Sequence, residues 1–468
     1  MSRFDLAVVG LGSAGIAAAR FAATLGVRVV AVERARVGGD CLWTGCVPSK
    51  ALLASARAAH AARRAGALGV RTGEIGVDGP GVWERIRRVQ RDIAAGEDNA
   101  DALRRCGVEV VEGEARLTSP TTLAVGERTL AARRILLCTG SRPAVPPIPG
   151  LADAGYLTSD TLWGLVEPPG RVLVLGAGPV GCEMAQALGR VGARVALVEA
   201  LPGILARDEP ALAHALAGVL TREGVEVVTG ARVSRVSTRA GEHTVHADAG
   251  GAPRSWTVDA ILVATGRSPT IDGLGLEEVG VATGPRGVAV DRRLRTSVRT
   301  VYAAGDVTGR HLFTHSAAHD AVTAVRNMLF PGAAAAATPV PWCTFTDPEL
   351  AHVGLTVPEA EERHGAPRVH AHRSDLAASD RGRADGVEVG ELLVVTAKGR
   401  IVGAHVLAPG AGEIAHAFLI PVSRRMRLRD LSGLVHVYPT LSWQTALLAA
   451  EASYARASRL RFLVRRRS

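Results

Sequence analysis

The chain has 468 residues, a formal net charge of +10 and an aromatic content of 4%. This length suffices for about three or four domains with sizeable cores. No uninterrupted apolar run reaches the length that a bilayer requires, and a strand-like run begins already at Phe4, so we expect a cytoplasmic protein with no signal peptide and no membrane span. The cysteines, at positions 41, 46, 106, 138, 182 and 343, lack metal-ligand spacing; we assign no metal and interpret the last four as small buried hydrophobic residues.

The N-terminal segment has the sequence of a dinucleotide-binding unit. The apolar run Phe4–Val9 predicts a strand, and a glycine-rich turn, an alanine-rich helical stretch and a second strand ending at Glu33 follow. Gly10 permits the tight turn, Gly12 lets the backbone approach a pyrophosphate, and Gly15 lets the helix pack closely on the strand. The phosphate then lies at the helix N-terminus, and the acid accepts hydrogen bonds from ribose hydroxyls. A glycine-rich turn without a ligand is the alternative, and the order of strand, glycines, helix, strand and acid speaks against it.

A candidate redox centre follows in Gly38-Gly39-Asp40-Cys41-Leu42-Trp43-Thr44-Gly45-Cys46-Val47-Pro48-Ser49-Lys50. Only a few residues separate Cys41 from Cys46, so a disulfide between them would be local and exchangeable. A structural disulfide gains stability by closing a long loop, whereas this small ring constrains little of the unfolded chain. The pair therefore indicates a redox function, and two buried thiols in a cytosolic protein are the alternative.

The dinucleotide pattern then repeats. The apolar run Arg171–Leu175 leads into Gly176, Gly178 and Gly181, and a helix and a second strand follow before Glu199. The interval from the first glycine to the acid is the same in both copies. Each copy also closes with a strand and a similar tail, Cys138-Thr139-Gly140-Ser141-Arg142-Pro143 in the first and Ala264-Thr265-Gly266-Arg267-Ser268-Pro269 in the second. The chain therefore contains two dinucleotide-binding units, and the cysteine pair lies in an insertion of the first.

With this arrangement the chain resembles the flavin-dependent pyridine nucleotide-disulfide oxidoreductases, the family of dihydrolipoamide dehydrogenase, glutathione reductase and mercuric reductase. Val301-Tyr302-Ala303-Ala304-Gly305-Asp306 resembles the second flavin motif of the family, and Thr346-Asp347-Pro348-Glu349-Leu350-Ala351-His352-Val353-Gly354 resembles its dimerisation-domain signature. The resemblance covers essentially the whole chain and implies FAD in the first unit and a nicotinamide nucleotide in the second. The implied FAD site contains Gly10, Gly12, Gly15, Glu33, Gly39, Thr139, Gly140 and Asp306, and the implied nucleotide site contains Gly176, Gly178, Gly181, Glu199 and Gly266.

An α/β fold is expected, with two Rossmann-like dinucleotide-binding domains and a C-terminal α+β dimerisation domain. Within the first domain, residues 82–106 predict a charged amphipathic helical stretch. The proline-rich segment 143–150 predicts a boundary, because successive prolines forbid both helix and central strand. In chain order we predict an FAD-binding domain that carries the redox disulfide at 1–145, an NAD(P)-binding domain at 146–267, a central domain that completes the FAD site at 268–339, and a dimerisation domain at 340–468, with an alanine-rich linker at 331–341.

Lysine is rare in this chain. The positive charge comes almost wholly from arginine, and the only lysines are Lys50 and Lys398. In the resembling enzymes the lysine after the cysteine pair lies beside flavin N5 and pairs with a glutamate of the second unit, which here matches Glu183. A cation there favours the reduced, anionic flavin, and a guanidinium would not fit the same geometry. An ordinary surface lysine is the alternative.

The resemblance also implies an order of electron transfer. Hydride from the nicotinamide reaches flavin N5 on one face, and the disulfide lies against the other face. Cys46 would be the cysteine nearer the ring, and Cys41 would be the interchange thiol. Both cysteines precede a helix predicted over 48–59, whose dipole should lower the pKa of the thiols.

The acid of the second unit favours NADH as the electron donor. A carboxylate at Glu199 binds the ribose diol and repels a 2′-phosphate, by about 4 kcal/mol per charge pair in a protein-surface dielectric. Arg194 and Arg207 could offset part of that repulsion, so NADPH is the alternative.

The C-terminal active-site segment departs from the family pattern. The disulfide reductases carry His-Pro-Thr there, with a glutamate after the threonine, and these side chains reach into the partner subunit's site, where the histidine protonates the leaving thiol. Here Tyr438 stands before Pro439 and Thr440, and Trp443 replaces the glutamate. Tyrosine has an ordinary pKa near ~10, and loss of a general acid–base typically costs on the order of 10² to 10⁴ in rate. Efficient turnover of lipoamide or glutathione is therefore not expected, and His436, at a position that serves structure in the family, is no simple replacement.

Three functions stay open, and the resemblance implies a homodimer for each. The first is an FAD-dependent enzyme that passes electrons from NADH to the Cys41–Cys46 disulfide and on to a small-molecule acceptor: a quinone, oxygen, a metal ion or an unusual disulfide. The second is an NAD(P)H:quinone, oxygen or metal-ion reductase in which the disulfide is incidental. The third is a non-catalytic flavoprotein that acts as a binding module.

Two further features bear on partners. Mercuric reductases also tend to have a tyrosine in the C-terminal segment, but they hand the ion over through a C-terminal cysteine pair, and this sequence has no cysteine after Cys343. Mercury reduction is therefore less favoured. The basic segment 459–468 is most simply solvated, and we expect no nucleic-acid partner.

Overall fold

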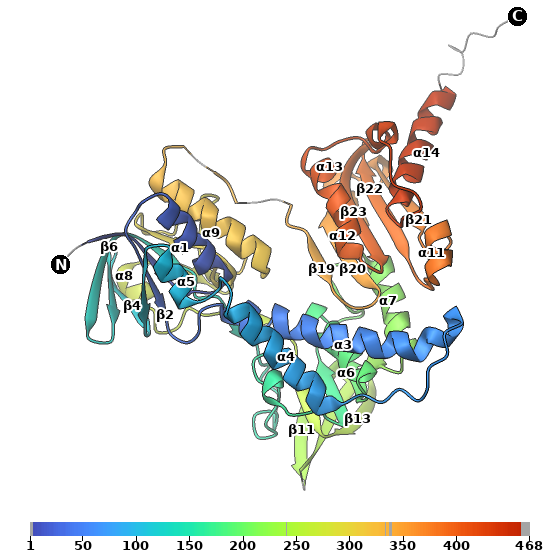
Figure 1. Cartoon of the computed structure of the whole chain (residues 1–468), viewed down its shortest axis with the longest axis horizontal. Coiled ribbons are helices and arrows are strands. Elements are labelled where there is room, and N and C mark those ends of the chain that lie inside the picture. Colours follow the sequence, from blue (N-terminus) through green and yellow to red (C-terminus); the bar gives the residue numbers. More distant parts are fainter. Residues whose placement is uncertain (1–2, 240, 333, 337–338, 460–468) are drawn as a thin grey trace, which may run out of the picture.

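The structure is a computed structural model that describes residues 3–239, 241–332, 334–336 and 339–459. Figure 1 shows an N-terminal unit at the left, a second unit in green at the lower centre, and a C-terminal unit in orange and red at the upper right. Most of the basic segment, 460–468, and residues 333, 337 and 338 of the expected linker lie outside the described residues. None of the helices in the described ranges combines the length and apolarity needed to traverse a bilayer.

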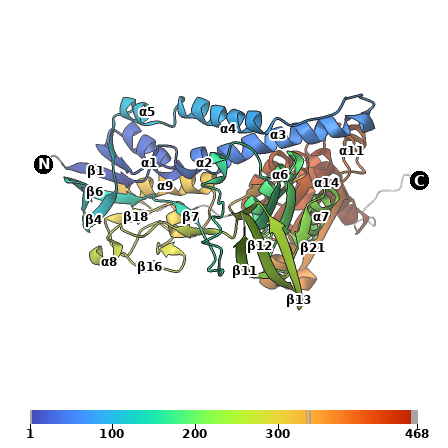
Figure 2. The same ribbon diagram turned by 90° about the horizontal axis from the view of Figure 1, so that it is seen from below.

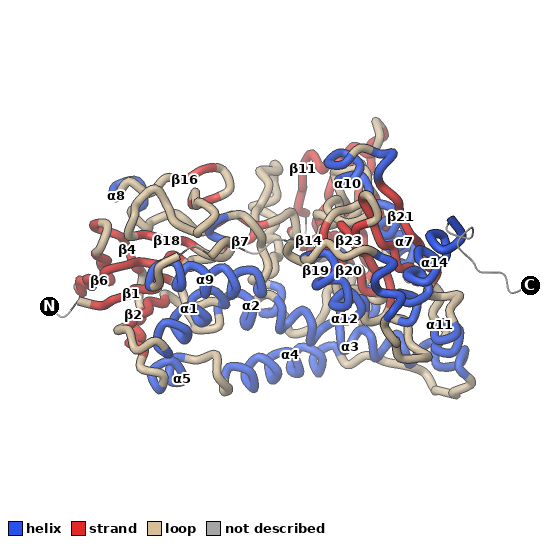
Figure 3. The backbone as a smooth tube through the Cα atoms, turned by 90° about the horizontal axis from the view of Figure 1, so that it is seen from above, coloured by secondary structure: helices blue, strands red, loops and turns tan. Residues whose placement is uncertain are grey.

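The N-terminal unit is built on one sheet with the strand order β3-β2-β1-β6-β5-β4, and β18 pairs with β6. β1, β2, β3, β6 and β18 pair with one another in parallel, and their apolar runs suit a sheet that is covered on both faces. β6 also pairs with β5, in antiparallel fashion. The helices α1 (Ser13–Thr24) and α9 (Thr314–Leu329) pack together on one face, so residues beyond 300 complete this unit (Figure 3). The strands are β1 Phe4–Val9, β2 Val29–Glu33, β3 Val108–Glu112, β4 Ala115–Ser119, β5 Thr122–Val125, β6 Arg128–Leu137 and β18 Val301–Ala303.

The insertion after β2 consists of helices. α2 (Gly39–Trp43) is short and holds Cys41, and α3 (Cys46–Arg64) begins at Cys46, earlier than the predicted start at residue 48. Figure 2 shows α3 and α4 (Gly79–Ala94) running side by side along one edge of the molecule. The stretch 82–106 was expected to be one helical segment, and this prediction was wrong, because the chain leaves the helix after Ala94. It re-enters at α5 (Ala100–Arg105), where the Asn99 side chain accepts a hydrogen bond of 2.8 Å from the Ala102 amide and caps the new helix.

The second unit repeats the parallel pattern with the strand order β10-β9-β8-β14 and adds an antiparallel sheet, β11-β12-β13. Two short strands at the ends of the units, β7 and β15, pair with each other and join the closing tails. The elements of this unit are β8 Arg171–Leu175, α6 Pro179–Arg190, β9 Arg194–Val198, α7 Pro210–Arg222, β10 Glu226–Val228, β11 Ala231–Arg239, β12 Glu242–Ala249, β13 Ala252–Val258 and β14 Ala260–Val263, and the joining strands are β7 Ser141–Pro143 and β15 Arg267–Pro269. The short elements α8 Leu276–Val279, β16 Thr283–Gly284 and β17 Gly287–Val288 lie with the N-terminal unit (Figure 2), where Leu276 and Val288 belong to the same apolar cluster as its sheet.

The C-terminal unit is an antiparallel sheet with the order β19-β20-β23-β22-β21 and helices against it. Its elements are β19 Trp342–Thr344, β20 Glu349–Gly354, α10 Val357–His364, β21 Val369–Asp375, α11 Asp380–Asp385, β22 Glu391–Ala397, β23 Arg400–Ala408, α12 Ala411–Ala415, α13 Leu419–Ser423 and α14 Trp443–Arg459. The alternating residues of β20 and β23 face two different apolar clusters, so both faces of this sheet are covered. The expected α/β fold, with two dinucleotide-binding units and an α+β C-terminal unit, is confirmed.

Candidate active site

The first strand of each dinucleotide unit ends at a glycine that the fold requires. Gly10 has a φ of +92°, and a Cβ added there would lie 2.5 Å from the carbonyl oxygen of Cys138. Gly176 has a φ of +101°, and its added Cβ would lie 2.6 Å from the carbonyl oxygen of Ala264. Both positions combine a left-handed φ with a close backbone approach, which only glycine meets without strain. The two turns are therefore built alike.

The second glycine of each turn faces open space instead. No atom lies within 4 Å of a Cβ added at Gly178, and the nearest atom to one added at Gly12 is the Cα of Gly39, 3.8 Å away. Neither α1 nor α6, which start beyond these glycines, has a side-chain cap. The first amides of both helices are thus free to bind an anion, and the helix dipole favours one. This geometry fits the diphosphate of FAD in the first unit and of NAD(P) in the second.

The acids at the ends of the second strands stabilise the same turns. Glu33 accepts hydrogen bonds from the amides of Leu11, at 2.6 Å, and Ala35, at 2.9 Å. Glu199 accepts equivalent bonds from Ala177, at 2.7 Å, and from the second residue after the acid, at 2.9 Å. Each carboxylate oxygen retains lone pairs, so both acids can still accept from ribose hydroxyls. The same local structure thus occurs in both units.

One continuous cavity of about 2280 Å³ joins the two turns, the cysteine pair and the C-terminal unit. Pockets for a single small ligand usually measure about 300–1,000 Å³, so this volume suits two dinucleotides. Gly15 and Gly181 are not in its wall, because both pack against the carbonyl of the first glycine of their turn. The other predicted cofactor residues line it: Gly10, Gly12, Glu33, Gly39, Thr139, Gly140, Asp306, Gly176, Gly178, Glu199 and Gly266.

The two cysteines meet in this cavity as free thiols. A hydrogen bond from Cys41 lowers the pKa of Cys46 to about 6, against burial, and the Thr314 hydroxyl and the charge of Lys50 lower it further. The Thr314 oxygen lies 3.5 Å from the Cys46 sulfur. The same hydrogen bond, together with burial, raises the pKa of Cys41. The two opposite shifts favour a thiolate at Cys46 and a proton at Cys41 in the reduced pair.

Lys50 lies at the point where the three units meet. Its Nζ is 2.7 Å from Oε2 of Glu183, a buried residue of α6, and 4.5 Å from the ring centroid of Phe345 in the C-terminal unit. The other oxygen of Glu183 accepts a hydrogen bond of 2.9 Å from the Phe345 amide. The structure therefore brings together the lysine and glutamate that the resemblance paired, and it fixes the ammonium near the cysteines.

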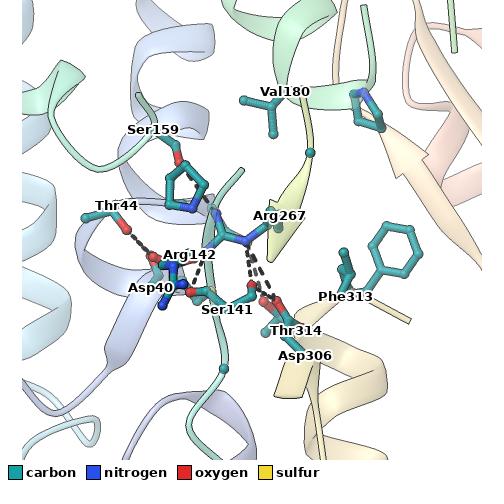
Figure 4. A pocket seen from close by; sticks show the side chains of 18 of the residues that line it. Asp40, Thr44, Ser141, Arg142, Ser159, Val180, Arg267, Asp306, Phe313 and Thr314 are labelled. Atoms are coloured by element: carbon teal, nitrogen blue, oxygen red, sulfur yellow. Dashed lines mark hydrogen bonds and ion pairs between the residues drawn. The ribbon is translucent and has the colours of Figure 1, made fainter. Parts of the chain in front are cut away.

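A cluster of polar residues lies where β7 and β15 pair, as Figure 4 shows, and only its member Asp306 was predicted from the sequence. Arg267 Nε donates a hydrogen bond of 2.7 Å to the Ser141 hydroxyl, which donates one of 2.6 Å to Asp306. Nη2 of the same arginine pairs with the Asp40 carboxylate. Burial raises the pKa of Asp306, and the Ser141 bond and the Arg267 charge oppose this. The sequence feature that could have indicated this cluster is the arginine in each closing tail, Arg142 in the first and Arg267 in the second.

Two arginines were expected to modify donor selectivity at Glu199, and the structure places them differently. Arg194 begins β9, and Glu199 follows its last residue, so a full strand of about 16 Å separates their backbones. The guanidinium of Arg207 lies 5.1 Å from the ring centroid of Trp342, over which it stacks. This separation favours a small effect of Arg194 at Glu199, and the effect of Arg207, which lines the same cavity as Glu199, stays a prediction.

Within one chain Tyr438 does not reach the cysteines. It lies with Trp443 in a separate cavity of about 230 Å³, where the two rings make an edge contact at 5.7 Å. The Tyr438 hydroxyl donates a hydrogen bond of 3.1 Å to Asp380, which raises its pKa. Next to it Val435 and Val437 are 100% and 75% exposed. This apolar surface suits burial against a second subunit.

The sequence patterns of known families match almost the whole chain. The family described as "Pyridine nucleotide-disulphide oxidoreductase" matches residues 4–326, and its "dimerisation domain" matches residues 340–447. The chain therefore belongs to the pyridine nucleotide-disulfide oxidoreductase family. It is a homodimeric FAD- and NAD(P)-dependent oxidoreductase.

Relatives with curated names and solved structures agree with this assignment. The chain is 35% identical over 460 residues to a mercuric reductase of Shigella flexneri, covering 93% of this chain and 78% of that protein. It is 34% identical over 454 residues to a dihydrolipoyl dehydrogenase of Chlorobaculum tepidum, covering 94% and 95%. The HOCl-induced flavoprotein disulfide reductase RclA from Escherichia coli superposes with a TM-score of 0.83 at 27% identity, covering 96% and 99%. Its Cu(II) complex superposes with the same TM-score at 26% identity, covering 96% and 100%.

Proposed function

We propose that the protein passes an electron pair from NADH through the Cys41–Cys46 disulfide to an acceptor that needs no histidine-assisted thiol exchange. In this proposal residues 1–145 and 268–339 hold FAD, 146–267 hold the nicotinamide nucleotide, and 340–468 form the dimer. FAD supplies the two-electron chemistry that links a nicotinamide to a disulfide. We also expect the protein to act in the cytoplasm, where a reducing environment suits an exchangeable pair.

The state of the two sulfurs supports this proposal most directly. Two-electron reduction breaks the S–S bond, and the product here is a Cys46 thiolate with the proton on Cys41. The Lys50 ammonium, held by Glu183, stabilises that thiolate. A disulfide that was incidental to the chemistry would not need this arrangement of charge. Cys41 then acts as the interchange thiol.

The C-terminal segment supports the choice of acceptor. The Tyr438 hydroxyl already donates to Asp380, and Trp443 offers no carboxylate to orient a base. A disulfide substrate would therefore release its leaving thiolate without efficient protonation. Two similar proteins point to a metal ion among the remaining acceptors, since one is named mercuric reductase and another was solved as a Cu(II) complex. A metal ion is accordingly the acceptor to test first, and a quinone the second.

Anaerobic titration with NADH, followed by absorbance, tests the relay. We expect a long-wavelength band in the wild type, as a thiolate beside oxidised flavin gives, and no such band in Cys46→Ser. Full bleaching of the wild-type flavin without that band would favour a reductase in which the disulfide is incidental. Flavin that resists reduction by NADH would favour a binding module instead.

The acceptor is tested in a second assay. NADH-dependent reduction of Cu(II), trapped by a Cu(I) chelator, should be lost in Cys41→Ser. Activity that survives this substitution would show that the acceptor bypasses the cysteine pair.

A further inference from the structure

Arg267 connects the second dinucleotide unit to the helix that carries Cys41. It begins β15, and its side chain, 18% exposed, reaches across the pairing of β7 and β15 (Figure 4). Besides the bond to the Ser141 hydroxyl, Nη2 donates to the Ser141 carbonyl at 3.1 Å and to the Asp40 carboxylate. Nη1 lies 3.5 Å from the Ser159 hydroxyl. The planar guanidinium is thus held by partners on several sides.

Asp40 controls the geometry of the turn between the two cysteines. It directly precedes Cys41, and its backbone carbonyl accepts hydrogen bonds from the amides of Thr44, at 2.9 Å, and Gly45, at 2.6 Å. Its carboxylate accepts a bond from the Thr44 hydroxyl in addition to the one from Arg267. A shift of Asp40 would therefore move the whole segment that sets the distance between the two sulfurs.

Arg267 also balances negative charge at this point of the cavity. Asp40, Asp160 and Asp306 all line the cavity near it. Burial raises the pKa of Asp160 and so does the charge of Asp40, whereas the Arg267 charge lowers it. The neighbouring Arg142 does not share this task, because its guanidinium pairs with Asp272 at 2.7 Å. Without Arg267, the carboxylates next to the redox turn would lack this compensating cation.

We propose that Arg267 is a positioning residue for the cysteine pair: by fixing and neutralising Asp40 it sets the equilibrium between the Cys41–Cys46 disulfide and its reduced form. This inference rests on the proposed function. Removal of the cation leaves carboxylates that disfavour the Cys46 thiolate, and the equilibrium shifts toward the disulfide. Removal of the Asp40 charge has the opposite effect.

The test measures this equilibrium without turnover. The FAD-loaded protein is equilibrated in glutathione buffers of graded ratio, quenched with an alkylating reagent, and the oxidised fraction of the pair is quantified by mass. We expect Arg267→Met to shift the midpoint ratio about tenfold toward the disulfide and Asp40→Asn to shift it about threefold toward the dithiol. Arg267→Lys should recover only part of the shift, because a single ammonium cannot bond Asp40 and Ser141 as a fork does. Arg142→Met is the matched control and should leave the midpoint within twofold of wild type.

The midpoints of the variants test the role of Arg267, and the exchange of the wild-type pair tests the proposed function. Equal midpoints in wild type, Arg267→Met and Asp40→Asn would overturn the role of Arg267, as would an equally large shift in Arg142→Met. If Arg267→Met fails to fold, the opposite-sign shift in Asp40→Asn still decides the matter, because a loss of packing would not favour the thiolate. A wild-type pair that never exchanges between the two states would overturn the proposed function itself.

Discussion

The hydroxyl of Tyr438 donates a hydrogen bond to the carboxylate of Asp380, 3.1 Å away. The bond raises the pKa of Tyr438, because loss of the proton would place two negative charges together. The side chain therefore stays neutral and is not a base at neutral pH. Trp443 packs edge-on against the ring and keeps it in place. The two contacts hold this segment in a defined conformation.

Introducing the histidine and glutamate of the family pattern at positions 438 and 443 should allow the protein to reduce disulfide substrates such as lipoamide. We expect Tyr438→His/Trp443→Glu to raise NADH-dependent lipoamide reduction about 10- to 100-fold over a slow wild-type rate, because a general acid–base typically contributes about 10² to 10⁴. Steady-state assays of the double variant beside wild type check this. Tyr438→Phe, which removes only the hydroxyl, is the control and should leave metal-ion reduction within about threefold. A wild type that already reduces lipoamide rapidly would contradict the proposed role of the segment.

Loss of the Lys50 cation should change the titration of Cys46. The positive charge lowers the Cys46 pKa, so Lys50→Met raises it, and less thiolate remains at pH 7. The rate of alkylation of Cys46 in the reduced protein, measured from pH 5 to 9, should rise near pH 6 in the wild type and at higher pH in the variant. Lys398→Met, at an exposed turn, is the matched control. Identical pH profiles for Lys50→Met and wild type would show that the ammonium does not act on the sulfur.

The Thr314 hydroxyl should contribute a smaller part of the same effect. It lies 3.5 Å from the Cys46 sulfur, and a net hydrogen bond of about 1 kcal/mol corresponds to about a fivefold change in the ratio of thiolate to thiol. Thr314→Val should therefore shift the alkylation profile to higher pH, whereas Thr314→Ser should not. Ser49→Ala serves as a control, because that hydroxyl bonds the Cys46 carbonyl rather than the sulfur. An unshifted profile in Thr314→Val would rule out this contact as a stabiliser of the thiolate.

The preference for NADH should depend on Glu199. We expect Glu199→Gln to lower the ratio of kcat/KM for NADH to that for NADPH about tenfold, because the neutral amide no longer repels a 2′-phosphate. The amide oxygen can keep one of the two turn contacts, with the amide of Ala177 or with that of Leu201. Arg194→Ala should leave the ratio unchanged, since this residue stands at the far end of β9. Steady-state kinetics with both nucleotides measure the ratio. A wild type that prefers NADPH would contradict the assignment.

The sequence alone predicted those parts of the fold that depend on neighbouring residues. Phe4–Val9 and Arg171–Leu175 are strands with the expected bounds, because a buried parallel strand is a short apolar run and a glycine follows each of these two. The split of 82–106 was missed, since helical periodicity on both sides concealed the Asn99 cap. The domain boundaries and the roles of the site residues stay predictions.

Contacts between distant segments were beyond the sequence. Arg267 and Asp40 are 227 positions apart, and Cys46 and Thr314 are 268 apart. Such pairs form only because β7 joins β15 and α9 returns to the first unit. The spacing of residues within one motif carries no information on contacts between such distant segments. Lys50 and Glu183 were paired only because a family resemblance supplied the contact.

Because lysine is scarce in this chain, amine acylation can be used to probe the ion pair of Lys50 and Glu183. Apart from the amino terminus, an acylating reagent finds only two amines in 468 residues. Lys398 stands exposed on a turn and reacts in any state, so it provides an internal standard. The extent of acylation of Lys50 relative to Lys398 would therefore report how strongly the Glu183 carboxylate binds the Lys50 ammonium. Peptide mapping of the native protein would measure this ratio in the oxidised and the reduced states of the cysteine pair.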